Sequence, residues 1–331
     1  MYSIAYIIPY FGNLREDFKI WAKSCEENPT IDFFVITDDR SYEKNDYCNI
    51  HFVYMDFPSL KSKVQELYDF TISLDKPYKL CDYKPAYGEI FSDLIAGYDF
   101  WGHCDMDLIF GDIRKFITTD ILSRYDRVGK WGHSILYRNT EENNRRYRTV
   151  FSDLLSYRTV YSSSESFFFD EMGLHEIYNR LGVETYVDTK IADMHPSYWQ
   201  LQVISDDPLE REKNKHRIFY WNDGKLISYS VVAKKVYKDE YMYIHFLRRP
   251  MELINCDTEL NKFLIVPNTI TNVSDFLVKR DFIISISRNR MDKYWISLIK
   301  RKWRIATPKK VYVYFKGRIR GAYRKLFKNG Q

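Results

Sequence analysis

The sequence predicts an α/β fold whose main sheet is mostly parallel and doubly wound. Apolar segments of strand length alternate with helical segments over the first 110 residues, which is the pattern of successive βαβ units. Polar or aromatic clusters follow three of these apolar segments, at the sheet edge where such folds bind ligands. A chain of 331 residues that is 45% hydrophobic and 17% aromatic can bury the core of one large domain of this class.

The first third of the chain supplies four strands and three helices. The strands are expected over residues 3–9, 31–37, 51–55 and 99–103, and the helices over residues 14–27, 60–73 and 85–96. The first strand is apolar throughout, as a central parallel strand is. The first helix has an apolar face formed by Phe18, Trp21, Ala22 and Cys25.

The pattern is less regular after Asp112. A strand is expected over residues 127–137, an arginine-rich helix over residues 143–157, and a helix that carries Asp170 and Glu171 over residues 166–181. Two further strands are expected over residues 219–228 and 240–246, and the second ends near His245. We find no internal repeat and no low-complexity linker.

Charge is distributed unevenly along the chain. Residues 291–331 contain thirteen Lys or Arg and one acid, a balance of +12, so the other 290 residues carry −7 of the net charge of +5. We therefore predict a folded domain over residues 1–290 and a basic amphipathic tail over residues 291–331. The tail interleaves its charges with aromatic and aliphatic residues, as an interfacial membrane helix does. A solvated basic tail and an oligomerisation helix are the alternatives.

The five cysteines are scattered without a Cys-x-x-Cys pair. An odd, irregular set argues against a disulfide framework or a zinc site and favours a reducing cytosol. The first residues lack the basic start and cleavage site of a signal peptide, and no apolar run approaches the ~20 residues of a membrane span. We expect a cytoplasmic protein that is at most peripheral at the inner face of the membrane.

The most informative segment is residues 99–112, in which an apolar run ends at Asp105 and Asp107. Residues i and i+2 of an extended segment lie on the same side, so both carboxylates can face one point. Two convergent carboxylates typically hold Mn²⁺ or Mg²⁺, which takes further oxygen ligands from a phosphorylated substrate. The alternative, a solvated turn, would not need the apolar residues Phe100, Trp101 and Phe110 on either side.

These motifs resemble those of nucleotide-sugar glycosyltransferases of the GT-A fold, over roughly residues 1–250. The match is with the family that includes glycogenin and the bacterial lipopolysaccharide galactosyltransferases. That family has a basic residue at a helix start before the Asp-x-Asp strand, and a His-Phe strand end late in the domain. This chain has Lys84-Pro-Ala-Tyr-Gly-Glu-Ile-Phe91 before Asp105-Met-Asp107, and later Tyr243-Ile-His-Phe246. Its Ile-Ile-Pro-Tyr-Phe-Gly opening also resembles an uncharacterised group of bacterial polysaccharide-locus transferases.

The resemblance implies that Asp105, Asp107 and His245 ligate the metal and that a nucleoside diphosphate, with UDP favoured, completes its coordination. A core histidine is the alternative for His245. Arg248 is expected to contact the departing diphosphate, and a solvated surface charge is its alternative. The family's Gly-rich, Lys-Pro-Trp continuation is replaced here by Leu247-Arg-Arg-Pro250, which weakens that assignment.

Five further residues are expected around the donor. Lys84 is expected to reach the phosphates or the donor sugar from a helix N-terminus, which itself attracts anions. Asp82 is expected to bind sugar hydroxyls or to cap the helix. Tyr10 is expected beside the nucleobase or in the core, and Asp38 as an acceptor for a base N–H or a ribose hydroxyl. His133 lies where family members contact the sugar or the acceptor.

The acidic pair Asp170 and Glu171 is expected to face the acceptor. In an inverting enzyme one carboxylate would take the proton of the acceptor hydroxyl. In a retaining enzyme the same position would support or attack the oxocarbenium-like state. The resemblance favours retention, and the residues alone leave both outcomes open. A solvated helix face is the alternative for the pair.

The sequence thus predicts a metal-dependent glycosyltransferase that moves a hexose from a nucleoside-diphosphate sugar to a glycan or lipid-linked acceptor in bacterial surface polysaccharide synthesis. A nucleotidyltransferase acting on sugar phosphates is the main rival, but it would normally carry a Gly-rich phosphate loop where this chain has Pro9-Tyr-Phe-Gly12. A non-catalytic sugar-binding module would not need a metal triad. Nucleic-acid binding is disfavoured by the acidic body of the chain.

Overall fold

The computed structural model describes residues 1–43, 47–196, 198–247, 249, 251–256, 262–274 and 277–288. Met1–Arg288 form one compact unit. The predicted basic tail, and with it the expected membrane contact, lies outside the described residues. Among the residues that are described, no helix combines the length and the apolar character needed to cross a bilayer.

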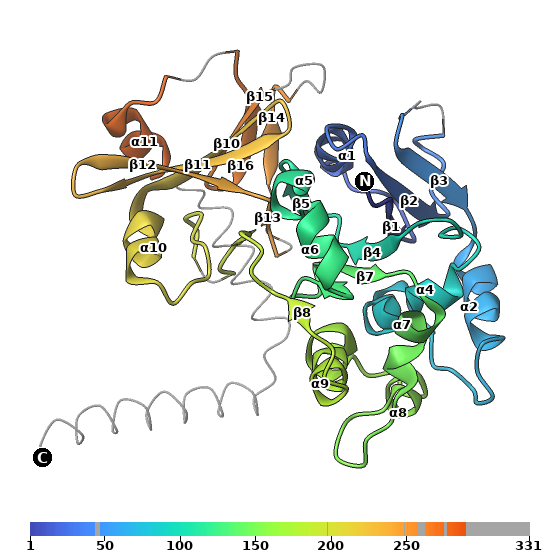
Figure 1. Cartoon of the computed structure of the whole chain (residues 1–331). Coiled ribbons are helices and arrows are strands. Elements are labelled where there is room, and N and C mark those ends of the chain that lie inside the picture. Colours follow the sequence, from blue (N-terminus) through green and yellow to red (C-terminus); the bar gives the residue numbers. More distant parts are fainter. Residues whose placement is uncertain are drawn as a thin grey trace, which may run out of the picture. The chain divides into compact units, whose positions relative to one another are not determined.

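The main sheet has seven strands in the order β3-β2-β1-β4-β7-β6-β8 (Figure 1). All neighbours pair in parallel except β7, which runs antiparallel to both β4 and β6, so β7 alone among these seven described strands is reversed. The strands are β1 (Ile4–Pro9), β2 (Ile31–Thr37), β3 (Ile50–Tyr54), β4 (Phe100–Cys104), β6 (Arg127–Val128), β7 (Ser134–Arg138) and β8 (Thr185–Tyr186). This arrangement confirms the predicted α/β fold with a mostly parallel sheet.

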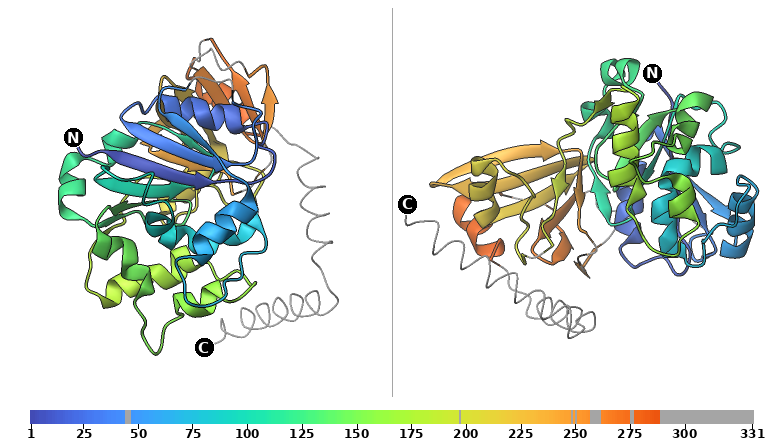
Figure 2. Two further views of the ribbon diagram at one scale, coloured as in Figure 1. Left: turned by 90° about the vertical axis from the view of Figure 1, so that its right-hand side faces the viewer. Right: turned by 90° about the horizontal axis from the view of Figure 1, so that it is seen from below.

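Alternate residues of β1 enter two hydrophobic cores on opposite faces of this sheet. Ile4, Tyr6 and Ile8 belong to the core that includes α1 (Phe18–Glu26), whereas Ala5 and Ile7 belong to the core that includes α2 (Phe57–Gln65). The left view of Figure 2 shows these two helices on opposite sides of the sheet. Burial on both faces explains why the first strand is apolar throughout.

The remaining helical segments are short. They are α3 (Leu80–Tyr83), α4 (Tyr87–Ile90), α5 (Ile113–Phe116), α6 (Thr119–Arg124), α7 (Glu141–Arg145), α8 (Tyr157–Tyr161), α9 (Leu174–Arg180), α10 (Pro208–Lys213) and α11 (Arg280–Ile286), the 3-10 turns η1 (Pro77–Lys79), η2 (Lys84–Ala86), η3 (Arg146–Arg148) and η5 (Asn214–His216), and the π-helix η4 (Phe169–Gly173). Single turns of this kind depend on tertiary packing, because isolated helices of such length are unstable in water.

Three of the predicted helices are therefore wrong in extent. The segment 85–96 contains only the end of η2 and the single turn α4, and the segment 143–157 divides into α7, η3 and the start of α8. The helix expected over 166–181 begins at Phe169, and its first turn is the π-helix η4. Phe168 takes a left-handed conformation with φ 54°, so the residues before it cannot continue the helical path.

A second sheet of six strands has the order β12-β11-β10-β15-β16-β14. Its strands are β10 (Arg217–Asn222), β11 (Lys225–Val232), β12 (Lys235–Tyr241), β14 (Glu252–Ile254), β15 (Lys262–Val266) and β16 (Thr269–Asn272). The single strand predicted over residues 219–228 is wrong, because β10 and β11 form a hairpin there. The chain turns at Asp223 and Gly224, which have φ angles of 46° and 73°. Two successive positive φ angles are the signature of the turn that favours Asp-Gly.

A third sheet of three short strands brings distant segments together. β13 (Tyr243–His245) lies between β5 (Leu108–Phe110), to which it is antiparallel, and β9 (Ala192–Asp193), to which it is parallel. His245 is in register with both Leu108 and Asp193. The strand expected over residues 240–246 therefore consists of the end of β12 and all of β13. This small sheet sets His245 beside the turn that follows β4.

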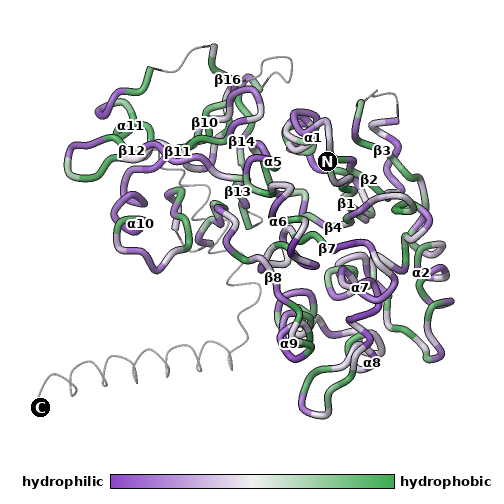
Figure 3. Tube along the Cα trace, viewed as in Figure 1, coloured by the Kyte–Doolittle hydropathy of each residue, from purple (hydrophilic) through white to green (hydrophobic). Residues whose placement is uncertain are grey.

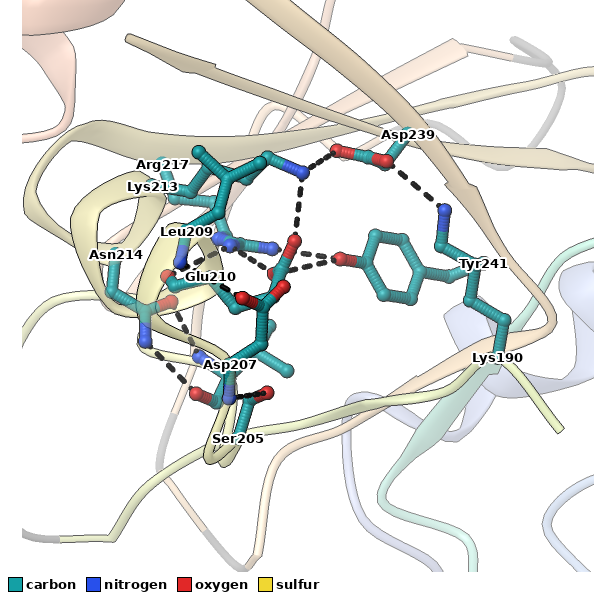
Figure 4. A network of polar contacts seen from close by, with 11 residues as sticks. Lys190, Ser205, Asp207, Leu209, Glu210, Lys213, Asn214, Arg217, Asp239 and Tyr241 are labelled. Carbon is teal, nitrogen blue, oxygen red and sulfur yellow. Dashed lines mark hydrogen bonds and ion pairs between the residues drawn. The ribbon is translucent and has the colours of Figure 1, made fainter. Parts of the chain in front are cut away.

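A network of ion pairs fastens α10 to the second sheet (Figure 4). α10 is mostly hydrophilic (Figure 3), and its Glu210 carboxylate accepts from Arg217 Nη2 at 2.6 Å and Lys213 Nζ at 2.7 Å. Lys213 Nζ also donates to Asp239 Oδ2 at 2.7 Å, and Tyr241 Oη accepts from Arg217 Nη1 at 2.9 Å. The Arg217 side chain is fully buried, so its charge depends on Glu210.

We expect Glu210→Gln to lower the free energy of unfolding by about 3 kcal/mol at pH 7, because it leaves the buried Arg217 charge unpaired. Burial alone would raise the pKa of Glu210, but Arg217 and Lys213 outweigh it and hold that pKa below its ordinary 4.5. A lowered folded-state pKa stabilises the protein above pH 4.5, and this stabilisation is lost as the pH falls through the folded-state pKa. Urea denaturation from pH 7 to pH 3 should show the two proteins converging at low pH. Glu212→Gln, an exposed acid of the same helix, is the control, and equal stability of wild type and Glu210→Gln at pH 7 would contradict the prediction.

Candidate active site

The candidate site begins at the carboxyl end of the central strand β4. β4 ends at Cys104, and the chain turns through Asp105, Met106 and Asp107 before β5 begins. A ligand atom from each of Asp105, Asp107 and His245 lies within 4.8 Å of the other two. His245 Nε2 is 3.5 Å from Asp107 Oδ1. The structure therefore brings together the three residues that the resemblance names as metal ligands.

Asp193 supports His245 from the neighbouring strand β9. Its Oδ1 is 2.8 Å from His245 Nδ1, which leaves Nε2 directed at Asp107. A carboxylate behind a ligating histidine fixes the ring and its tautomer. Although burial alone would lower the pKa of His245, the hydrogen bonds with Asp107 and Asp193 outweigh it and raise that pKa to about 9. The sequence reasoning missed Asp193, because a strand of two residues leaves no periodic signal.

Lys84 lies at the start of η2 and is buried beside the same carboxylates. Its Nζ donates to Asp105 Oδ1 at 2.8 Å and to the Gly132 carbonyl at 2.7 Å, and lies 3.5 Å from Asp170 Oδ2. Burial alone would lower the pKa of Lys84, but Asp105 and Asp170 outweigh it and hold the amine charged. Lys84 therefore links the Asp-x-Asp turn to the predicted acidic pair.

The acidic pair lies in the π-helix η4. Asp170 is buried, and burial, opposed by Lys84 and reinforced by Glu171, raises its pKa to about 6. Glu171 is half-buried, and its Oε1 accepts from the Gly132 amide at 3.1 Å. Gly132 is needed here, because a Cβ at this position would lie 2.2 Å from Asp170 Oδ2. A π-helical turn in place of a regular helix is frequent at functional sites.

Asp82 holds the segment that carries the pair. Its carboxylate accepts from Lys79 Nζ at 2.8 Å and from the amides of Phe167 and Phe169, each at 3.1 Å. The side chain is 1% exposed. The structure thus gives Asp82 a positioning role beneath η4, and we do not place it among the residues that contact the sugar.

The two residues expected at the nucleobase lie at the ends of neighbouring strands. Tyr10 directly follows β1, where its amide donates to the Ile36 carbonyl at 2.8 Å, and its side chain is half-buried. Asp38 follows β2 and is exposed, and its Oδ1 accepts from the Gly12 amide at 2.7 Å. β1 lies between β2 and β4, so these residues share the sheet edge with Asp105. Their contact with a base remains a prediction.

The loop after His245 is resolved into two cases. Arg248 lies outside the described residues. Arg249 is 4% exposed, and its guanidinium donates to the carbonyls of Tyr198 and Gln200. Arg249 therefore ties two loops together and does not present a free charge to a diphosphate.

His133 lies between the acidic pair and the metal ligands in sequence and in space. Its ring centroid is 4.3 Å from that of His245, and its Nδ1 is 2.8 Å from Tyr243 Oη. Burial, reinforced by the neighbouring His245, lowers the pKa of His133 to about 3, so the ring is neutral. With 5% of its surface exposed, the ring has little area to offer a sugar.

The residues fit a divalent cation. Two carboxylates and one imidazole converge, and the Asp105 side chain keeps 34% of its surface exposed, so oxygens of a phosphorylated ligand have access to the cluster. Exposed aromatic side chains of Trp131 and Phe168 flank the buried Asp170 in the sequence segments that meet at Gly132. The arrangement supplies a cation site, a charged lysine and a buried acid of raised pKa at one edge of the sheet.

Comparison with known proteins adds a family and a set of similar structures. A model described as a family of unknown function (DUF6625) matches residues 6–274. None of the curated proteins matches the sequence. Mouse xyloside xylosyltransferase 1 is similar in structure, with 10% identity and a TM-score of 0.37 over 60% of this chain and 89% of that chain.

Two other similar structures come from the same class of enzyme. The galactosyltransferase LgtC, solved with donor and acceptor sugar analogues, has 12% identity and a TM-score of 0.37 over 73% of this chain and 86% of that chain. The glycosyltransferase GlyE of Streptococcus pneumoniae TIGR4 has 11% identity and a TM-score of 0.29 over 56% of this chain and 45% of that chain. All three structures are glycosyltransferases, the class that the sequence motifs resemble. At these scores the likeness is weak, so the chemistry of the site has to stand on its own residues.

Proposed function

We propose that this chain, which belongs to the DUF6625 family of unknown function, is a metal-dependent glycosyltransferase that uses a nucleoside-diphosphate sugar. The observation that carries the proposal is the convergence of Asp105, Asp107 and His245 at the carboxyl end of β4, with Asp193 behind His245. This is the edge at which α/β sheets bind nucleotides. The donor we propose is a UDP-hexose, and the cation is Mn²⁺ or Mg²⁺.

Asp105, Asp107 and His245 would hold the cation. When bound, it would neutralise the charge that develops on the diphosphate as the bond to the sugar breaks. Lys84 keeps Asp105 in place through the 2.8 Å hydrogen bond and adds a buried positive charge beside the phosphates. Arg248 would contribute a second positive charge from the following loop, and Tyr10 and Asp38 would bind the base and the ribose.

Asp170 is the residue we assign to the reacting sugar. Its carboxyl group is buried, has a raised pKa and is 3.5 Å from Lys84 Nζ, which stabilises the ionised form. A carboxylate in this position either takes the proton of the acceptor hydroxyl or supports the oxocarbenium-like state. Glu171 is anchored on the Gly132 amide and faces the same loop. The acceptor we propose is a glycan or a lipid-linked sugar in bacterial surface polysaccharide synthesis.

A nucleotidyltransferase acting on sugar phosphates is the rival, because it uses a similar cation site. The two activities differ in the bond that is broken. A glycosyltransferase releases UDP from a UDP-hexose, slowly to water when no acceptor is present. A nucleotidyltransferase forms UTP and a sugar phosphate from a UDP-hexose and pyrophosphate.

The experiment is to incubate the purified chain with UDP-glucose or UDP-galactose and Mn²⁺, with and without pyrophosphate, and to separate the nucleotides by chromatography. We expect UDP in both mixtures and no UTP, and we expect EDTA to stop UDP release. UTP formed only with pyrophosphate would establish the rival activity. The absence of both products, together with the absence of UDP binding, would overturn the assignment as an enzyme of UDP-sugars.

A further inference from the structure

His133 has a ring nitrogen that the proposed site does not use. Its Nδ1 faces Tyr243 Oη at 2.8 Å, while its Nε2 is buried and has no hydrogen-bond partner among the described residues. A buried nitrogen without a partner is costly, so such atoms call for an explanation. The ring is 95% buried and lies 4.3 Å from the ring of His245, centroid to centroid.

A second cluster of ligand atoms connects His133 to the cation site. One ligand atom from each of His133, Asp193 and His245 lies within 4.8 Å of the other two. The cluster Asp105, Asp107 and His245 satisfies the same condition. The two clusters share His245, so His133 adjoins the cation site through that residue.

The backbone holds His133 against the same turn. The carbonyl of His133 accepts from the Asp105 amide at 3.0 Å, and the preceding Gly132 carbonyl accepts from Lys84 Nζ at 2.7 Å. Tyr243, the partner of Nδ1, is two residues from His245 on the same strand β13. Strand residues two apart point to the same face, so Tyr243 and His245 both face the His133 ring.

We propose that His133 is a second imidazole ligand of the cation held by Asp105, Asp107 and His245, and that it makes the site select Mn²⁺ and related transition-metal ions over Mg²⁺. The proposal rests on the proposed function only for the location of the cation. Tyr243 Oη accepts from Nδ1–H of His133, as Asp193 accepts from Nδ1–H of His245, so both rings keep an Nε2 lone pair for the cation. Imidazole nitrogen favours transition metals, whereas Mg²⁺ prefers oxygen and water.

The test measures binding of the metal alone, without nucleotide. Free Mn²⁺ is followed by its electron paramagnetic resonance signal, and Mg²⁺ by competition. We expect His133→Phe, which keeps a flat ring beside His245, to raise the Kd for Mn²⁺ about 10- to 100-fold, and the Kd for Mg²⁺ by less than about threefold. Tyr243→Phe is the matched control, because it removes the hydroxyl and keeps Nε2. It should change the Mn²⁺ Kd by less than His133→Phe does.

Pulsed resonance on wild-type protein labelled with ¹⁵N-histidine needs no variant and decides the case if His133→Phe does not fold. Coupling of Mn²⁺ to two directly bound histidine nitrogens would support the proposal. Coupling to one nitrogen, or an Mn²⁺ Kd in His133→Phe equal to that in Tyr243→Phe, would overturn it and leave the proposed glycosyltransferase intact. If the wild-type chain bound no Mn²⁺, both the ligand assignment and the metal dependence would be wrong.

Discussion

Replacing Asp107 with asparagine is expected to abolish metal-dependent binding of UDP. Asparagine keeps the shape of the side chain but removes a negative charge from a cluster in which Asp107 Oδ1 lies 3.5 Å from His245 Nε2. A neutral amide oxygen is a weaker ligand for a hard cation than a carboxylate. We expect the Kd for UDP in the presence of Mn²⁺ to rise at least about 100-fold, because losing even an outer partner of a metal ligand costs 10- to 100-fold.

Calorimetric titration of UDP into the wild-type and variant proteins, with Mn²⁺ or with EDTA, measures this effect. Asp120→Asn is the control, because Asp120 is an exposed acid that pairs with Arg124 on α6. UDP affinity that is independent of the metal in the wild type, or unchanged in Asp107→Asn, would show that the cluster does not hold the cation. Titration with GDP in parallel identifies the base that the site accepts.

Replacing Asp170 with asparagine is expected to slow transfer about 10²- to 10⁴-fold, the range for loss of a carboxylate that acts on the reacting group. Binding of UDP should change by less than about threefold, because Lys84 keeps its hydrogen bonds to Asp105 and to the Gly132 carbonyl. A selective loss of rate is what distinguishes a residue at the reacting sugar from one that only shapes the site.

The rate is followed as UDP released from a UDP-hexose with Mn²⁺, and the affinity by titration with UDP. Asp153→Asn, which alters an exposed carboxylate paired with Arg180, controls for loss of negative charge. Glu171→Gln is measured beside it. A larger loss in Glu171→Gln, with Asp170→Asn within about fivefold of wild type, would move the assignment to Glu171.

The strand pattern of the main sheet was predictable because burial there is one-sided or two-sided in a regular way. β2 has the predicted bounds, residues 31–37, and β1, β3 and β4 agree with prediction to within one residue at each end. Each of these strands contributes to the cores on the two faces of the sheet, so its hydrophobicity is uniform or alternating along the chain. The Asp-Gly turn of the second sheet was equally readable, although the prediction passed over it.

The helices after β4 were less predictable, because tertiary contacts decide where they begin and end. The π-helix η4 depends on Asp82, which accepts from the amides of Phe167 and Phe169 across more than 80 residues of sequence. No local pattern encodes such a contact. The same holds for Asp82 itself, which the sequence alone suggests as a sugar ligand or a helix cap and which the structure shows beneath η4.

What the sequence by itself determined is the fold class, the apolar strands and the position of Asp105 and Asp107 at a strand end, because all of these follow from short-range periodicity. Only the tertiary structure decided which distant residues join them. Pairing of β13 with β5 and β9 sets His245 beside Asp107 and Asp193, and Lys84 reaches Asp105 and Asp170 from a third segment. Such pairings depend on the register of strands more than 100 residues apart, and that register is set by packing of the whole domain.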